Sequence, residues 1–155
     1  MILAELGSTP YKILLLLHLV AVIVAFGAPF ANPVIYRLSA RDGAGGTVAG
    51  AQAAAATRIS IPALLIAGLL GFGLSGLSKV PGTDELQYRL SQGWLSAAVL
   101  IWLGQAALYF FAIVPALKKV GAGDEAAAGR VAMFTGLLHL SLLVMLWLMI
   151  WKPGL

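Results

Sequence analysis

The chain alternates between long apolar runs and short polar connections. Four runs reach the roughly 20 residues that an α-helix needs to cross a bilayer core of about 30 Å. They cover residues 11–31, 59–77, 94–114 and 131–151. Each run must be helical, because the lipid interior offers backbone groups no hydrogen-bond partner. The pattern therefore predicts an all-α, up-down four-helix bundle that spans the membrane as a single domain over residues 1–155.

The composition supports this interpretation. Of the 155 residues, 61% are hydrophobic and 10% are charged, whereas charged residues make up about 25% of a soluble domain. Lys12 is charged but lies at the end of its run, where its stem can reach the headgroups. The chain contains no cysteine, which excludes disulfide scaffolds and thiolate metal sites. We expect the first run to be a retained helix and not a signal peptide, because no basic segment precedes it.

Lysine and arginine are distributed unequally between the two sides of the membrane. Four spans place both termini on one side, and the first and third connections on the other. The connections carry Arg37, Arg41, Arg58, Lys118, Lys119 and Arg130, and the terminal side carries Lys12, Lys79, Arg89 and Lys152. The positive-inside rule then predicts a multi-pass protein of a bacterial cytoplasmic membrane, with both connections cytoplasmic and both termini outside. No dense basic patch indicates nucleic acid as a partner.

The two halves of the chain resemble each other. Phe30-Ala-Asn-Pro33 and Phe111-Ala-Ile-Val-Pro115 are each followed by basic residues, a Gly/Ala-rich stretch and a new span. This pattern favours two repeated helical hairpins, related by an axis along the membrane normal. The alternative is that the exits of unrelated helices share these features.

Local signals refine the helix boundaries. The alanine-rich segment 48–58 and a cap at Asp124 predict that the second and fourth helices extend past the bilayer. Prolines inside or beside the first two spans predict kinks at Pro29, Pro33 and Pro62. Pro115 and Pro153 follow the third and fourth spans, where we expect those helices to end.

Small residues are the predicted contacts between helices. Lipid tails are as apolar as leucine, so helices associate by close packing through small side chains. The candidate helix-packing residues are Gly68, Gly71, Gly76, Ala132 and Gly136.

Few polar side chains of any size lie inside the spans: His18, Gln105 and His139. Asn32 directly follows the first span and is a further candidate for a buried polar residue. Intramembrane ionisable residues usually face the bundle interior. One interpretation is that each histidine is neutral and hydrogen-bonds across helices, for example to Gln105 or Thr135. The alternative is that His18, His139 or both ligate haem b. Their depths in the two spans differ by about five residues, or ~7.5 Å along the membrane normal, which a shared metal tolerates only if a helix tilts.

The sequence gives less support to a copper site or a catalytic site. Met145 and Met149 lie one turn apart, as Cu(I) ligands would, but this spacing is also typical of packing. No Ser/His/Asp set, zinc-protease motif or phosphate loop is present, so we do not expect an enzyme. The leading hypothesis is a non-catalytic accessory, assembly or oligomer-forming component of a membrane complex, with a membrane protein or a second copy as partner. A haem-binding protein or oxidoreductase subunit is the alternative, and a small transporter is the second alternative.

The two ends of the chain carry short motifs. Tyr11-Lys12, with His18 in the following run, and the closing Leu148–Gly154 resemble a bacterial family of small predicted integral membrane proteins of unknown function. This resemblance covers all four spans and implies a fold and a location. The chain is also distantly similar to four-helix membrane proteins that bind haem or copper through a first-helix histidine, the copper-resistance D and membrane protoporphyrinogen-oxidase groups. That similarity points to His18 alone, and residues 22–26 lack the tryptophan expected after it.

Overall fold

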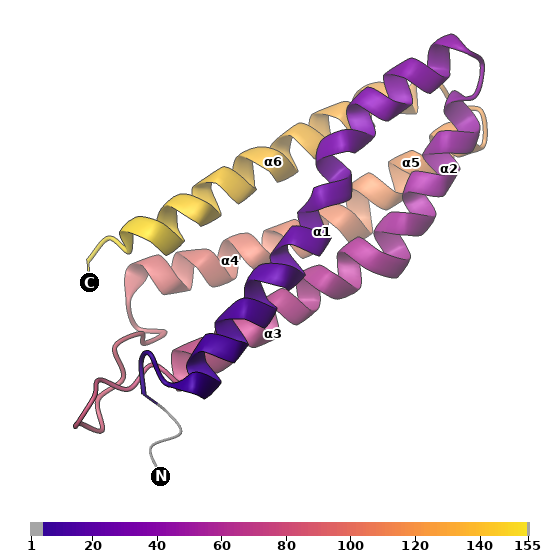
Figure 1. Cartoon of the computed structure of the whole chain (residues 1–155). Helices are drawn as coiled ribbons and strands as arrows, with labels where there is room; N and C mark the ends of the chain where they lie inside the picture. Colours follow the sequence, from indigo (N-terminus) through magenta and orange to yellow (C-terminus); the bar gives the residue numbers. More distant parts are fainter. Residues whose placement is uncertain (1–4, 155) are drawn as a thin grey trace.

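The computed structural model describes residues 5–154, which form four long helices (Figure 1). The first is α1 (Thr9–Arg41). The second consists of α2 (Gly45–Ala55), the π-helical η1 (Ala56–Ser60) and α3 (Ile61–Gly76). The third consists of α4 (Gly93–Ala107), the π-helical η2 (Leu108–Ile113) and α5 (Val114–Gly121), and the fourth is α6 (Ala127–Trp151). All four are long and apolar enough to cross a membrane, so the all-α four-helix prediction is confirmed and the chain is a small polytopic membrane protein.

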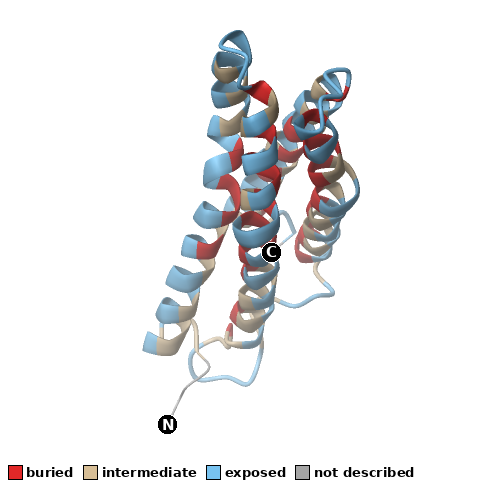
Figure 2. Cartoon of the chain, turned by 90° about the vertical axis from the view of Figure 1, so that its right-hand side faces the viewer, coloured by how far each residue is buried: buried red, intermediate tan, exposed pale blue. Residues whose placement is uncertain are grey.

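The helices pack as two hairpins side by side. α1 packs along α3 and α2, α6 packs along α4 and α5, and the hairpins meet mainly where α2 contacts α5. We call the end with the two short connections, residues 42–44 and 122–126, the loop end. The first and last described residues and the longer connection 77–92 lie at the opposite end, which we call the terminal end (Figure 1). Buried residues lie on the sides of the helices that face one another (Figure 2).

The helices are longer than the apolar runs that predict them. They contain 33, 32, 29 and 25 residues, so the longest measures about 50 Å against a bilayer core of about 30 Å. The second helix begins at Gly45, as its alanine-rich segment predicts. The third continues through Pro115 to Gly121, so the expected end at this proline is wrong.

The predicted cap of the fourth helix is also wrong. Ala126 occupies the N-cap position of α6, and no side chain caps the helix there. The Asp124 carboxylate instead lies 3.6 Å from the guanidinium of Arg130. The carboxylate that was expected to cap α6 therefore pairs with Arg130 instead.

Two π-helical turns accommodate prolines in the middle of the bundle. Proline has no N–H and its ring collides with the carbonyl four residues earlier. η1 ends two residues before Pro62, and η2 ends two residues before Pro115. The N–H of Ile61 reaches the Ala56 carbonyl, five residues back, and a wider turn of this kind makes room for the proline ring.

A close contact between backbones joins the hairpins at the loop end. A Cβ placed on Gly121 would lie 3.3 Å from both Cα and N of Gly50 and 3.5 Å from the Gly46 carbonyl oxygen. Gly46 and Gly50 are four residues apart, the spacing of the small-residue motif by which membrane helices approach closely. The Gly/Ala-rich stretch after α1 is therefore part of the α2–α5 contact.

The outward faces of the four helices are apolar. Large hydrophobic side chains are exposed along each of them, among them Ile23, Leu69, Phe111 and Leu143. Such a surface is stable in lipid, where apolar groups lose nothing by exposure. The bilayer is therefore the surrounding medium of the bundle.

Candidate functional site

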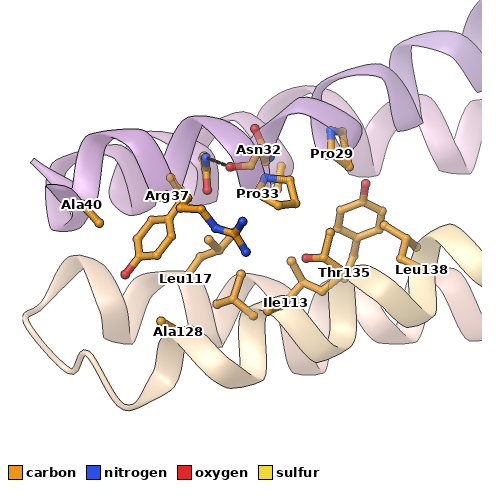
Figure 3. A pocket seen from close by; sticks show the side chains of 16 residues that line it. Pro29, Asn32, Pro33, Arg37, Ala40, Ile113, Leu117, Ala128, Thr135 and Leu138 are labelled. Atoms are coloured by element: carbon orange, nitrogen blue, oxygen red, sulfur yellow. Dashed lines mark hydrogen bonds between the residues drawn. The ribbon is translucent and has the colours of Figure 1, made fainter.

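A cleft opens between α1 and α6 in the half of the bundle nearest the loop end. These two helices make few contacts with each other, and the gap encloses about 300 Å³, the lower end of the volumes typical of ligand pockets. α1 and α6 form its walls, and α2, η1, η2 and α5 form its floor (Figure 3). The wall residues are Pro29, Asn32, Pro33, Tyr36, Arg37 and Ala40 on α1, and Ala128, Val131, Ala132, Thr135 and Leu138 on α6.

The prolines of α1 and the π-helical turns of the second and third helices all reach this cleft. Pro29 and Pro33 line it from α1, Ala56 from η1, and Tyr109 from η2. Irregular backbone at membrane depth is tolerated where it is buried or lines a cavity, and π-helical turns occur frequently at functional sites. The helix prolines of α1 and both π-helical turns are therefore gathered around one space.

Proline also explains why a tyrosine lies in the floor of the cleft. Pro29 has no N–H to donate to the carbonyl of Ala25, which would otherwise be unpaired inside the bundle. The Tyr109 hydroxyl donates to this carbonyl at 3.1 Å, and the tyrosine is only 1% exposed. Tyr109 thus holds α1 and η2 together at the point where α1 loses a helical hydrogen bond.

The polar side chains of the cleft come mainly from the α1 side. The Gln52 side-chain amide donates to the backbone carbonyl of Asn32 at 3.0 Å, which ties α2 to α1 and leaves the Asn32 side chain at the cleft wall. Thr135 adds a buried hydroxyl from α6. These neutral groups offer hydrogen bonds within a surface that is otherwise apolar.

Arg37 is the charged residue among those that line the cleft. Figure 3 shows its guanidinium group directed into the space between the two layers of helices, near Pro33 and Ile113. Within residues 5–154 the ion pairs are Lys79–Asp84, Arg89–Glu85 and Arg130–Asp124, so no described carboxylate neutralises Arg37. The cleft therefore carries an uncompensated positive charge at its outer end.

His18 lies outside this cleft, between α1 and α3. Its Nδ1 is 2.8 Å from the carbonyl oxygen of Ala67. Because a carbonyl only accepts, Nδ1 carries the proton and Nε2 has the free lone pair. The ring passes over Gly71, where a Cβ would lie 3.5 Å from the imidazole Cε1. His18 thus makes a hydrogen bond across helices, with a backbone carbonyl and not with Gln105 or Thr135 as partner.

The structure does not bring His18 and His139 together. The His139 ring stacks on Phe30 of α1, with ring centroids 4.2 Å apart and parallel planes. Phe30 is twelve residues from His18 along α1, a distance of about 18 Å along the helix. A single metal therefore cannot be bound by both histidines. The Nε2 atom of His139 is buried and has no hydrogen-bond partner.

Gln105 links the third and fourth helices. It is 2% exposed, and its side-chain amide donates to the hydroxyl of Ser141 at 3.1 Å. Ser141 in turn donates to the Leu138 carbonyl at 2.7 Å. The polar group nearest the middle of α4 is therefore satisfied within the second hairpin.

Two glycines of α3, Gly68 and Gly73, leave space into which a large side chain of a neighbouring helix packs. A Cβ on Gly68 would lie 2.1 Å from Cε2 of Trp102, whose indole N–H donates to the Leu64 carbonyl at 2.9 Å. Gly73 is similarly close to Leu14. At Gly76 and Gly136 a Cβ would meet no atom within 4 Å, so neither glycine makes a close helix contact. Ala132 lines the cleft.

Several residues of the cleft are absent from the sequence-based candidates. Gln52 is hidden in an alanine-rich stretch, and Tyr109 is one of several aromatic residues near a span end. Counting backbone donors around Pro29 could have indicated that a hydroxyl must reach Ala25. The four-residue spacing of Gly46 and Gly50 could have revealed the α2–α5 contact.

Within the described part of the chain, no three His, Cys, Asp or Glu side chains lie close enough to hold a metal ion. No family model, curated protein or solved structure matches the chain. The family resemblance of the two chain ends therefore stays a prediction.

Proposed function

We propose that this polytopic membrane protein is a non-catalytic component that works by binding a membrane-soluble molecule in the cleft between α1 and α6. It thereby acts as an accessory or assembly factor in the bilayer, and not as an enzyme. The observation that carries the proposal is the convergence of Pro29, Pro33, η1 and η2 on one cavity. Irregular backbone costs stability in lipid unless it is buried or shapes a site.

The chemistry of the lining supports binding over catalysis. Acid–base catalysis needs a titratable group within hydrogen-bond reach of a substrate proton. The ionisable side chains of the cleft are Arg37, Tyr36 and Tyr109, and the Tyr109 hydroxyl already donates to Ala25. A mostly apolar lining with a few polar groups is typical of a site that holds and orients a ligand.

Filling the cleft tests the proposal. Ala132→Phe places a ring in the cavity, and Ala128→Phe does so from one turn earlier on α6. Ala107→Phe, at an exposed position outside the lining, makes the same chemical change as a control. Native mass spectrometry of protein extracted from membranes in mild detergent should detect one retained small molecule in the wild type and in the control, and none in the cleft variants.

Circular dichroism establishes that each variant is folded before the comparison. If folded Ala132→Phe and Ala128→Phe proteins retain the same molecule as the wild type, the cleft is not the binding site. If the wild type retains nothing after extraction in several mild detergents, the binding role itself is refuted.

A specific observation also favours haem b at His18 as the second candidate. Metal-bound histidines usually donate their other N–H to a carbonyl or carboxylate, and His18 donates from Nδ1 to Ala67. Nε2 would be the ligand atom. Purified protein from haem-supplemented cells should then show a Soret band that His18→Ala removes, and a spectrum without that band would exclude this candidate.

A further inference from the structure

The cleft differs in character along its length. Its inner end, around Pro29, Tyr109 and Leu138, is apolar, and the tyrosine hydroxyl there is already hydrogen-bonded. Its outer end, towards the loop end, contains Tyr36 and Arg37 (Figure 3). A molecule that fits this gradient has an apolar part and an anionic part.

The position of the cleft in the bilayer matches the same gradient. Lys12 lies near the start of α1, and a lysine at the end of a span extends its ammonium group to the headgroup layer; this sets the reference depth at the terminal end. Pro29 is 17 residues further on and Arg37 is 25 residues further on, or about 26 Å and about 37 Å along the helix. With a hydrocarbon core of about 30 Å, Pro29 lies within the core and Arg37 lies at the opposite headgroup layer.

The charge at the loop end favours an anionic headgroup. Six lysines and arginines and three carboxylates lie there, against four cations and three carboxylates at the terminal end. One of the loop-end cations, Arg130, is paired with Asp124, whereas Arg37 lines the cleft without a described carboxylate partner. A guanidinium group binds phosphate through two parallel hydrogen bonds, which makes arginine well suited to this contact.

We propose that the cleft binds one anionic phospholipid from the leaflet at the loop end, with its phosphate on Arg37 and part of one acyl chain between Pro29 and Thr135. This inference rests on the proposed function and names its ligand class. A volume of about 300 Å³ holds part of a chain, and the remainder stays in the bilayer because α1 and α6 do not close over it. Tyr36, beside the arginine, lies at the depth where aromatic rings meet headgroups.

The test compares two arginines one turn apart on α1. Both are exposed, but Arg37 lines the cleft and Arg41 lies outside it. Delipidated full-length protein in mild detergent is equilibrated with equimolar dioleoylphosphatidylglycerol and dioleoylphosphatidylcholine, and native mass spectrometry counts the first bound lipid. The wild type and R41Q should favour the anionic phosphatidylglycerol about fivefold over phosphatidylcholine. R37Q should bind the two lipids about equally. R37K, which keeps the charge, should restore most of the preference.

Each other outcome contradicts a defined part of the account. Two outcomes overturn the assignment of the phosphate to Arg37: a wild type that binds one lipid without headgroup preference, or an equal loss of preference in R37Q and R41Q. Neither outcome contradicts the proposal that the cleft binds a ligand. If no lipid binds, or if the first bound partner is a second copy of the chain, the phospholipid proposal is overturned. Binding that Ala132→Phe does not reduce contradicts both the phospholipid and the cleft.

Discussion

Replacing Gly68 with alanine is the sharpest test of how the first and second hairpins hold together. The new Cβ would lie 2.1 Å from Cε2, 2.4 Å from Cζ2 and 2.5 Å from Nε1 of Trp102. Carbon atoms in contact are about 3.5–4.0 Å apart, so the indole must retreat by about 1.4 Å. Its hydrogen bond to the Leu64 carbonyl, now 2.9 Å, would then exceed the range of a hydrogen bond.

The expected cost follows from three contributions to the free energy of unfolding. Overpacking a tight contact costs about 1–3 kcal/mol, and a lost side-chain hydrogen bond in a membrane protein costs about 0.6 kcal/mol on average. Replacing glycine with alanine inside a helix returns about 0.5–1 kcal/mol. Gly68→Ala should therefore destabilise the protein by about 1–3 kcal/mol.

Gly136 provides the matched control. It lies inside α6, and a Cβ there would meet no atom within 4 Å. Gly136→Ala should therefore stabilise the fold by about 0.5–1 kcal/mol through helix propensity alone. Unfolding in mixed micelles by titration with sodium dodecyl sulfate, followed by circular dichroism, measures both free energies.

A double-mutant cycle assigns the cost to the indole. In a Trp102→Ala background the collision is removed, so Gly68→Ala should cost less than it does in the wild type. Equal effects of Gly68→Ala and Gly136→Ala would refute the claim that Gly68 makes room for the Trp102 indole. An undiminished cost of Gly68→Ala in the Trp102→Ala background would refute it as well.

Two further predictions concern polar contacts inside the membrane and use the same unfolding assay. Tyr109→Phe should cost about 1 kcal/mol by leaving the Ala25 carbonyl unpaired. In a Pro29→Ala background, where the helix itself supplies a donor, it should cost much less, and an unchanged cost would contradict this explanation. Gln105→Met should cost less than about 1 kcal/mol, because Ser141 keeps its own backbone acceptor; a collapse of the fold would mean that Gln105 has a further role.

The four spans were predictable because the bilayer imposes a simple length and polarity rule. Apolar runs near 20 residues can only be helices in lipid, and four such helices are present. The ends of the helices were less predictable. α1 continues ten residues past the end of its predicted span at residue 31, to Arg41, because packing against α2 stabilises helix beyond the hydrocarbon core.

The cleft could be predicted only in part. The sequence indicated Asn32 as a buried polar residue, the prolines of the first span as kinks and Ala132 as a helix-packing residue, but it did not show that they share one cavity. That depends on the angle between the hairpins, which is set by contacts such as Gly50 with Gly121. The positions of the histidines along their spans also did not show how far apart they lie. The offset between α1 and α6 places Phe30, and not His18, opposite His139.

Three of the polar residues within the bundle share a pattern that becomes visible only in the structure. His18 and Trp102 donate to carbonyls of α3 that lie one turn before a glycine, and Tyr109 donates to a carbonyl freed by a proline. In each case a backbone acceptor becomes accessible because a neighbouring residue lacks a side chain or an N–H. Polar side chains inside membrane helices therefore need not indicate a cofactor.

The central claim is that the space between α1 and α6 is a binding site. The number of lipids that the purified protein retains tests this claim most directly. We predict that native mass spectrometry finds one bound lipid on the wild type and on Ala107→Phe, and none on folded Ala132→Phe. The same occupancy in all three proteins would contradict the claim.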